Sequence, residues 1–291
     1  MITLAIHHRT TYLYNQPVRL NPHRLMLRPR DSRDLRIVSS TLRLIPDATL
    51  SWAQDVFGNA VATASFAAAT DQLVIESVTR LQLWALAWPV FDIAASAVDY
   101  PFAYTDAERT DLGALATCQY PDGDDRLRDW VEGHVRSRPT DTLSLLRDLA
   151  ASVNQAVRYQ SRDSEGTQSP LHSLDRGWGS CRDLAVLFVE AARSLGFGAR
   201  LVSGYLYNPQ PLPWDVGSTH AWAEIFVPGA GWITFDPTNR SVGGANLVPV
   251  AVARDIWQTT PVVGSFDGMT SAFNSMLVDV TVESVPPSAD E

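Results

Sequence analysis

A length of 291 residues predicts two domains, and a hydrophobic fraction of 45% is typical of ordinary globular cores. The net charge of −9 and the pI of ≈ 5.1 argue against nucleic acid as the main partner. The most apolar run, residues 81–98, is interrupted by Gln82, Pro89 and Asp92, so it does not indicate a membrane span. The N-terminus lacks a basic stretch followed by an apolar one, and we expect no signal peptide.

Residues 1–90 are predicted to form an all-β domain, most simply a β-sandwich. Short β-prone segments alternate with turn residues, and residues 55–59 are typical of a hairpin turn. The segments cover residues 3–11, 24–30, 35–46, 49–56, 60–67 and 72–83. Several arginines follow closely on one another here, and we rank a solvated face first, a domain contact second and an anion site third. They are Arg24, Arg28, Arg30, Arg33 and Arg36.

The histidines of the chain give no metal-binding pattern. His7 and His8 are adjacent on a predicted strand, so their side chains point to opposite faces and are poorly placed to chelate one ion. His23, His134 and His172 have no cysteine or histidine at zinc-like spacing. We therefore assign neither a metal nor a cofactor.

Residues 91–104 are interpreted as a linker, and helical periodicity follows over residues 124–135 and 142–157. Asp141 or Thr140 could cap the second helix. Polar segments at residues 161–171 and 208–218 predict loops beside a cleft.

Cys181 is placed by its sequence at the start of a helix. Gly177, Gly179 and Ser180 break regular structure before it, apolar residues then recur at helical spacing, and Gly196 predicts the end of the helix. The free N–H groups and the dipole at such a position favour a thiolate. The same N–H groups could donate to an oxyanion. For this cysteine alone, a buried structural role is the alternative.

His220 and Asp236 lie on two predicted strands joined by a turn at residues 228–231. An antiparallel pair brings the start of one strand near the end of the next. A four-residue loop would turn Asp236 away from His220, so we predict an odd-length loop or a bulge. Thiol, imidazole and carboxylate are the three groups that nucleophilic cysteine catalysis needs. Nearby Trp178 and Trp222 could shield the charged pair from water or could be ordinary core.

The motifs around these three residues resemble the transglutaminase-like superfamily, in particular its bacterial two-domain branch with an N-terminal β-rich domain. The matching segments are Gly-Ser-Cys-Arg-Asp-Leu-Ala (179–185), Ala-Arg-Leu-Val-Ser-Gly-Tyr (199–205), His-Ala-Trp-Ala-Glu (220–224) and Gly-Trp-Ile-Thr-Phe-Asp-Pro-Thr (231–238). The resemblance implies an α+β fold with a papain-like core over residues 105–240 behind the β-sandwich. It also implies that Cys181, His220 and Asp236 are the catalytic triad and that Tyr159 lies near the site, with a core tyrosine as the alternative. Because Trp178 and Trp222 flank the triad residues in the sequence, we expect them, with Tyr159, near the oxyanion or the substrate.

Residues 241–291 are interpreted as a C-terminal extension that packs on the core or on the N-terminal domain, with a strand near residues 277–282. The expected activity is a cysteine-dependent hydrolase of peptide or amide bonds in a protein or peptide substrate. The alternatives are acyl transfer to an amine, as in transglutaminases and more distantly arylamine acetyltransferases, and a binding module with a vestigial triad. Cys118 and Cys181 are both expected to be reduced, in a cytoplasmic protein without membrane or nucleic-acid partners.

Overall fold

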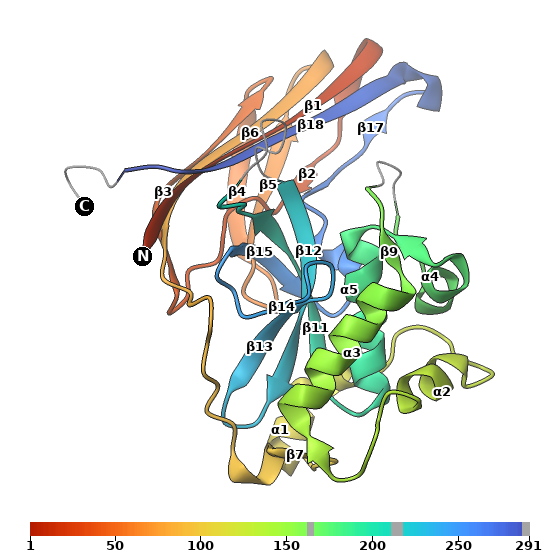
Figure 1. The fold of residues 1–291 in the computed structure, drawn as a ribbon. Coiled ribbons are helices and arrows are strands. Elements are labelled where there is room, and N and C mark those ends of the chain that lie inside the picture. Colours follow the sequence, from red (N-terminus) through yellow and green to blue (C-terminus); the bar gives the residue numbers. More distant parts are fainter. Residues whose placement is uncertain (162–165, 211–217, 287–291) are drawn as a thin grey trace.

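The computed structural model describes residues 1–161, 166–210 and 218–286 (Figure 1). The predicted loops at 161–171 and 208–218 therefore lie partly outside the described residues. In the described part, two β-sheets built mainly from the N-terminal region stand above a third sheet, and the helices cover one face of that third sheet.

The first N-terminal sheet has the strand order β17-β1-β6-β3, with β18 also paired to β1. Its strands are β1 (Ile2–Leu20), β3 (Leu35–Ile45), β6 (Thr70–Leu83), β17 (Phe266–Asp267) and β18 (Phe273–Ser284). The second sheet has the order β16-β2-β5-β4. It consists of β2 (His23–Leu25), β4 (Ala48–Gln54), β5 (Ala60–Phe66) and β16 (Val262–Val263).

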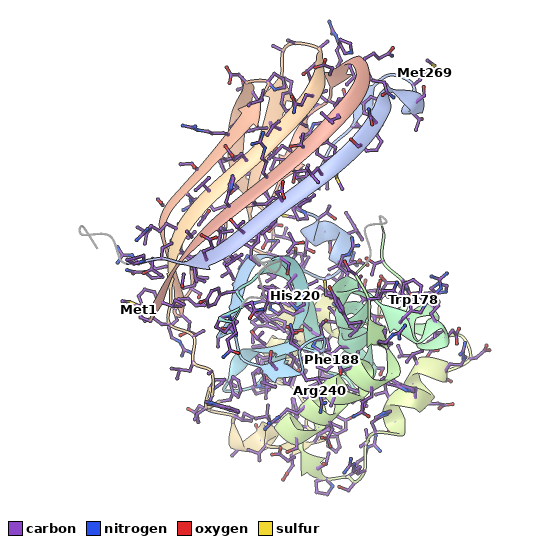
Figure 2. All side chains as sticks on the ribbon, turned by 45° about the horizontal axis from the view of Figure 1, so that its top comes forward. Met1, Trp178, Phe188, His220, Arg240 and Met269 are labelled. Carbon is purple, nitrogen blue, oxygen red and sulfur yellow. The ribbon has the colours of Figure 1, made fainter. Side chains whose placement is uncertain are left out.

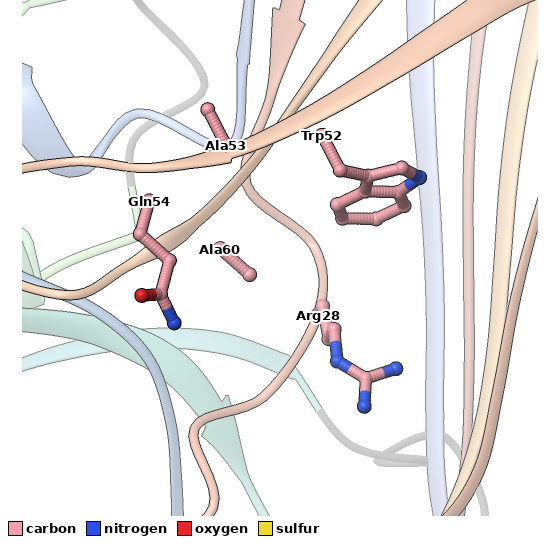
Figure 3. Close-up of a pocket in the computed structure, with 5 residues that line it drawn as sticks. All are labelled: Arg28, Trp52, Ala53, Gln54 and Ala60. Carbon is pink, nitrogen blue, oxygen red and sulfur yellow. The ribbon is translucent and has the colours of Figure 1, made fainter.

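The two N-terminal sheets form the expected sandwich, because alternate residues of both sheets share one apolar core. Leu44 and Ile75 of the first sheet belong to the same buried cluster as Ala62 and Ala64 of the second. A hollow of about 420 Å³ opens in this region beside β4 (Figure 3). It is lined by Arg28, Trp52, Ala53, Gln54 and Ala60.

The third sheet carries the segment that the sequence marked as functional. Its order is β14-β13-β12-β11-β15, and all of its pairings are antiparallel. The strands are β11 (Gly198–Leu206), β12 (Ser218–Val227), β13 (Gly231–Asp236), β14 (Ser241–Val242) and β15 (Leu247–Ala253). The α-helices are α1 (Asp106–Leu112), α2 (Arg126–Glu132), α3 (Thr142–Ala156), α4 (Pro170–Arg176) and α5 (Cys181–Ser194). Short strand pairs are β7 (Asp99–Tyr100) with β8 (Thr140–Asp141), and β9 (Arg158–Tyr159) with β10 (Trp178–Gly179).

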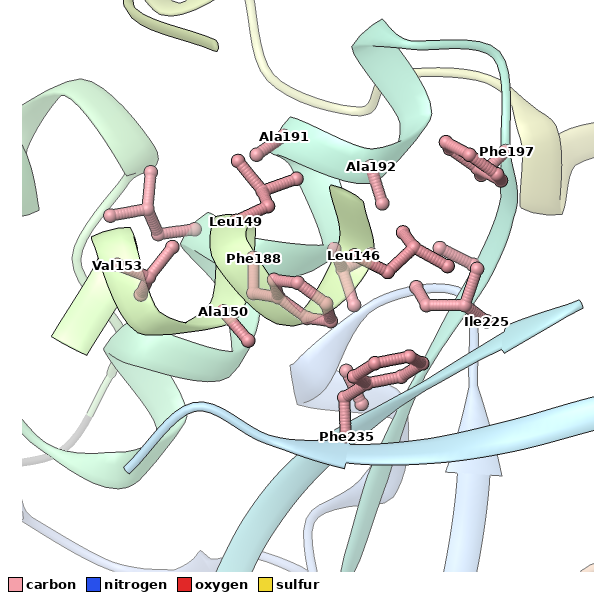
Figure 4. Packing of buried hydrophobic residues seen from close by; sticks show 14 of the residues in the cluster. Leu146, Leu149, Ala150, Val153, Phe188, Ala191, Ala192, Phe197, Ile225 and Phe235 are labelled. Atoms are coloured by element: carbon pink, nitrogen blue, oxygen red, sulfur yellow. The ribbon is translucent and has the colours of Figure 1, made fainter. Parts of the chain in front are cut away.

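Helix α5 is the centre of the lower half of the molecule. From Asp183 to Arg193 every residue is buried, because the sheet covers one side of the helix and α3 covers another (Figure 4). Phe188 of α5 meets Phe235 of β13 with the ring centroids 5.5 Å apart. Burial of each such ring contributes about 2–3 kcal/mol. As expected, Asp141 caps α3, its carboxylate accepting from Ser144 N at 2.7 Å.

The two halves share an apolar interface. Leu4, Ile6 and Leu81 of the first sheet pack against Tyr205 and Val248 of the third. The buried His8 imidazole is hydrogen bonded to the Tyr205 hydroxyl at 2.9 Å, while His7 lies on the opposite, exposed face.

The C-terminal residues contribute to both halves. Strands β14 and β15 complete the third sheet, and β16, β17 and β18 return to the sandwich, where β18 pairs with β1 along its length. The expected linker also packs on the lower core through Phe91, Ile93 and Phe102.

Candidate active site

Cys181 is the first residue of α5, as its sequence context predicted. Ser180 N and Ser180 Oγ donate to Asp183 Oδ2 at 2.7 and 2.8 Å, and Gln168 N donates to Asp183 Oδ1 at 2.6 Å. A side chain at Gly179 would place its Cβ 2.8 Å from Asp183 Cβ, so the close turn before the cysteine depends on glycine. This cap fixes the thiol at the helix N-terminus, where the first N–H groups have no partner within the helix.

His220 is the third residue of β12 and is 6% exposed. Its Nε2 lies 2.8 Å from Asp236 Oδ2, and its ring is also hydrogen bonded to the thiol of Cys181. Since Nε2 faces the carboxylate, Nδ1 is the nitrogen left for the sulfur. The three side chains therefore form one hydrogen-bonded line, with the imidazole in the middle. Figure 2 labels His220, which lies in the half of the molecule below the N-terminal sheets.

Asp236 reaches His220 because the β12–β13 hairpin has the odd-length loop that the face argument required. Val227 pairs with Gly231 and Ala223 with Phe235, so three residues form the loop. Asp236 then falls opposite Trp222, on the same face as His220. The prediction of an odd loop is confirmed.

Four donors surround the carboxylate of Asp236, which is 1% exposed. Thr238 N and Asn239 N donate to Oδ1 at 2.9 and 3.2 Å. Asn239 Nδ2 donates to Oδ2 at 2.7 Å, beside the imidazole nitrogen. On the far side of this turn, Asn154 Nδ2 donates to the carbonyl oxygens of Pro237 and Thr238, both at 3.0 Å. Asn239 and Asn154 were missed from the sequence; an asparagine directly after Asp-Pro-Thr was the available signal for the first.

The electrostatics of the line favour a charged pair. Burial raises the pKa of Cys181, but the hydrogen bond and positive charge of His220 outweigh it and lower that pKa overall. Burial lowers the pKa of His220, yet the bonds to Asp236 and Cys181 raise it to about 10. Burial likewise raises the pKa of Asp236, and the bond and charge of His220 bring it below its usual range. The charged forms, thiolate, imidazolium and carboxylate, therefore stabilise one another.

The three aromatic residues expected near the site differ in position. Tyr159 is half exposed and pairs with Gly179 in the β9–β10 bridge, two residues before the cysteine. Trp178 is partly exposed and lies under the guanidinium of Arg176, 5.1 Å from its ring centroid. Trp222 is 1% exposed and stacks beside the His220 ring at 6.0 Å, so it supports the imidazole from the interior.

Other sequence expectations concern cysteine pairing, metals and membrane spans. Both cysteines are free thiols. Within residues 1–161, 166–210 and 218–286, no group of three or more His, Cys, Asp or Glu side chains could hold a metal ion. Over the same ranges, no helix has both the length and the apolar character of a membrane span.

Together, the fold and the site define an α+β protein with a papain-like core and a line of a partly buried cysteine, a buried histidine and a buried aspartate. Residues 4–82 match the family model described as the bacterial transglutaminase-like N-terminal region, and residues 128–237 match that of the transglutaminase-like superfamily. The chain therefore carries a transglutaminase-like domain behind a bacterial transglutaminase-like N-terminal region.

Individual proteins align with this chain over nearly its whole length. An uncharacterized protein of Mycobacterium tuberculosis is 28% identical over 299 residues, which cover 97% of this chain and 92% of that protein. One from Mycobacterium leprae is 24% identical over 287 residues, covering 97% and 99%. The crystal structure of a candidate cysteine protease from Cytophaga hutchinsonii aligns with a TM-score of 0.73 at 18% identity, covering 99% of this chain and 92% of that one. At 18% identity, the alignment shows a shared fold and no more.

Proposed function

We propose that this protein is a cysteine-dependent hydrolase of peptide or amide bonds in a protein or peptide substrate. The observation that carries the proposal is the line of hydrogen bonds from Cys181 through His220 to Asp236. The description of the Cytophaga hutchinsonii protein as a candidate cysteine protease agrees with it. The cytoplasmic location stays a prediction.

The proposed reaction begins when the Cys181 thiolate attacks the carbonyl carbon of the substrate and forms a C–S bond. The N–H of Cys181 stabilises the oxyanion, and one such donor commonly contributes about 3 kcal/mol. His220 then gives its proton to the leaving amine as the C–N bond breaks, which leaves a thioester. In the second half, His220 takes a proton from water as the hydroxide attacks the thioester carbonyl. The C–S bond then breaks, which releases the carboxylic acid and restores the Cys181 thiolate beside the protonated His220. Asp236 holds the imidazole in place throughout.

Hydrolysis and acyl transfer differ only in whether water or an amine resolves the thioester. This chain carries no lysine and so offers no side-chain amine of its own as acceptor. A peptide library incubated with the protein, with and without added amine, and read by mass spectrometry, distinguishes the two reactions. New carboxyl termini or deamidated glutamines support hydrolysis. Products linked to the added amine would show that the protein is an acyltransferase instead. Acetyl transfer from acetyl-CoA would indicate the acetyltransferase alternative. If the wild-type protein forms no more of any product than Cys181→Ala does, a binding module is favoured.

A first prediction concerns alkylation by iodoacetamide, which reacts with the thiolate. Because the pKa of Cys181 is lowered, its thiolate persists as the pH falls below the usual range of a thiol. Burial and the negative charge of Glu190 instead raise the pKa of Cys118. We expect Cys181 to react at least about tenfold faster at pH 7, with peptide mapping as the readout. Equal, slow labelling of both cysteines would remove the claim that Cys181 is activated.

A further inference from the structure

The hairpin between β4 and β5 connects the N-terminal sandwich directly to the sheet that carries His220. Its turn residue Asn59 is fully buried. Asn59 Nδ2 donates to the carbonyl oxygen of Val252 at 2.8 Å, and Val252 N donates to Asn59 Oδ1 at 2.9 Å. The side-chain amide thus pairs with a residue of β15 in the way that a neighbouring strand would.

The turn itself is held in one conformation by charged side chains. Asp55 Oδ1 accepts from Phe57 N and Asn59 N, both at 2.9 Å, and Asp55 Oδ2 accepts from Asn59 Nδ2 at 2.8 Å. The guanidinium of Arg30 donates to the carbonyl oxygen of Phe57 and to Asn59 Oδ1. Arg30 also donates its backbone N–H to the carbonyl oxygen of Pro249 in β15, at 2.8 Å. Arg30, one of the five clustered arginines of the N-terminal region, therefore makes a domain contact, the role that was ranked second.

This rigid turn places Phe57 against the residues behind His220. Phe57 packs on the buried cluster of Val202, Trp222, Leu247 and Val252. Trp222 in turn stacks beside the His220 ring, 6.0 Å between centroids and 27° between planes.

The space around Trp222 is also closed from the side of β11. A Cβ at Gly204, which pairs with His220, would lie 2.8 Å from Trp222 Cη2 and 2.0 Å from the carbonyl oxygen of Val248. The indole therefore lies between Gly204 and the imidazole, within the cluster on which Phe57 packs.

We propose that Phe57 and Asn59 of the N-terminal domain are positioning residues for His220, acting through Trp222. The inference rests on the proposed function and gives the N-terminal domain a role in it. His220 must aim one nitrogen at the Cys181 sulfur and the other at Asp236. The stacked indole limits rotation of the imidazole, and the hairpin limits movement of the indole. A misplacement of about 1 Å in a reacting geometry commonly costs about 10²-fold in rate.

Phe57→Ala in the full-length protein tests this positioning. The truncation leaves space beside Trp222, so we expect the line from Cys181 to His220 to loosen. Alkylation of Cys181 at pH 7 should fall by about tenfold or more, its pH profile should shift toward higher pH, and kcat should fall more than KM changes. Phe57→Leu, which keeps most of the volume, should restore much of the wild-type profile.

Val56→Ala is the matched control, because Val56 is the neighbouring turn residue and is 93% exposed. It should leave alkylation, kcat and the thermal midpoint unchanged. A Phe57→Ala protein that is folded and shows the wild-type pH profile would overturn the inference, even if its midpoint is lower. If that variant does not fold, Phe57→Val decides, because it removes more side-chain volume than Phe57→Leu and less than Phe57→Ala. Slower alkylation of Cys181 with a profile moved toward higher pH supports the positioning role, and a wild-type profile together with a lower midpoint shows a structural role only.

The two proposals fail in different measurements. Slow alkylation of Cys181 in the wild-type protein counts against the proposed function. Fast alkylation in the wild type that is unchanged in the folded Phe57 variant counts against the positioning role alone.

Discussion

Changing Asp236 to asparagine should lower kcat by about 10³- to 10⁴-fold. The free energy of unfolding at neutral pH should change little. Both carboxylate oxygens of Asp236 accept N–H groups: Oδ1 from Thr238 and Asn239, and Oδ2 from Asn239 and His220. An amide placed there keeps one acceptor and turns an NH₂ group toward a donor. If its oxygen stays with the two backbone N–H groups, the NH₂ faces His220 Nε2. The imidazole proton then moves to Nδ1, and Nε2 becomes the acceptor.

The consequence for Cys181 is loss of the charged pair. Asp236 is the strongest cause that raises the pKa of His220 against burial, which opposes it. Without that carboxylate, the imidazole no longer holds a proton for the thiolate, and alkylation of Cys181 at pH 7 should slow in parallel with turnover. Asp175→Asn, at an exposed carboxylate that pairs with Arg126, is the control and should behave as wild type. Full activity of Asp236→Asn would exclude Asp236 from the proposed catalytic triad.

Local sequence signals located most of the fold. Helix α5 begins at Cys181 and its turn ends at Gly196, where φ is 89°, because glycine and serine punctuation is a short-range effect. The end of β1 was missed: Pro17 reads as a break, but a register shift between Leu13 and Val18 accommodates it. Strand β15 was missed for a related reason. Its Pro249 lies where the β11–β15 register shifts, so the absent N–H is tolerated.

The candidate site was predictable as far as face alternation reaches. Alternation required the odd loop that brings Asp236 to His220, and the structure has it. Face alternation predicts neither how deeply a side chain is buried nor which distant segments of the chain touch. Nothing local distinguishes Trp222, which is 1% exposed, from the partly exposed Trp178. The contact of Asn59 with Val252 joins residues 193 positions apart and depends on how the two sheets pack.

Among the variants discussed, Arg193→Ala should lower the free energy of unfolding most, by about 3–5 kcal/mol. Arg193 and Glu190 form a buried pair on α5, with Nη1 to Oε1 at 2.7 Å and side chains that are each 1% exposed. The guanidinium also donates to the carbonyl oxygens of Leu115, Ala199 and Arg254 at 2.8–3.0 Å. It thereby joins α5 to three separate segments of the chain.

The loss of stability in Arg193→Ala arises mainly from the buried carboxylate of Glu190, which is left without its positive partner. Glu190 keeps its bonds from Gln119 N and Tyr120 N, at 2.7 and 3.0 Å, but loses its positive partner in a site without water access. Urea unfolding should show a lower midpoint at an unchanged slope. Arg126→Ala, which breaks an exposed ion pair, should leave the midpoint nearly unchanged. The double variant Glu190→Gln/Arg193→Met should be more stable than Arg193→Ala, because no buried charge then lacks a partner. Equal stability of these two variants would show that the lost packing and carbonyl contacts, rather than the unpaired carboxylate, set the cost.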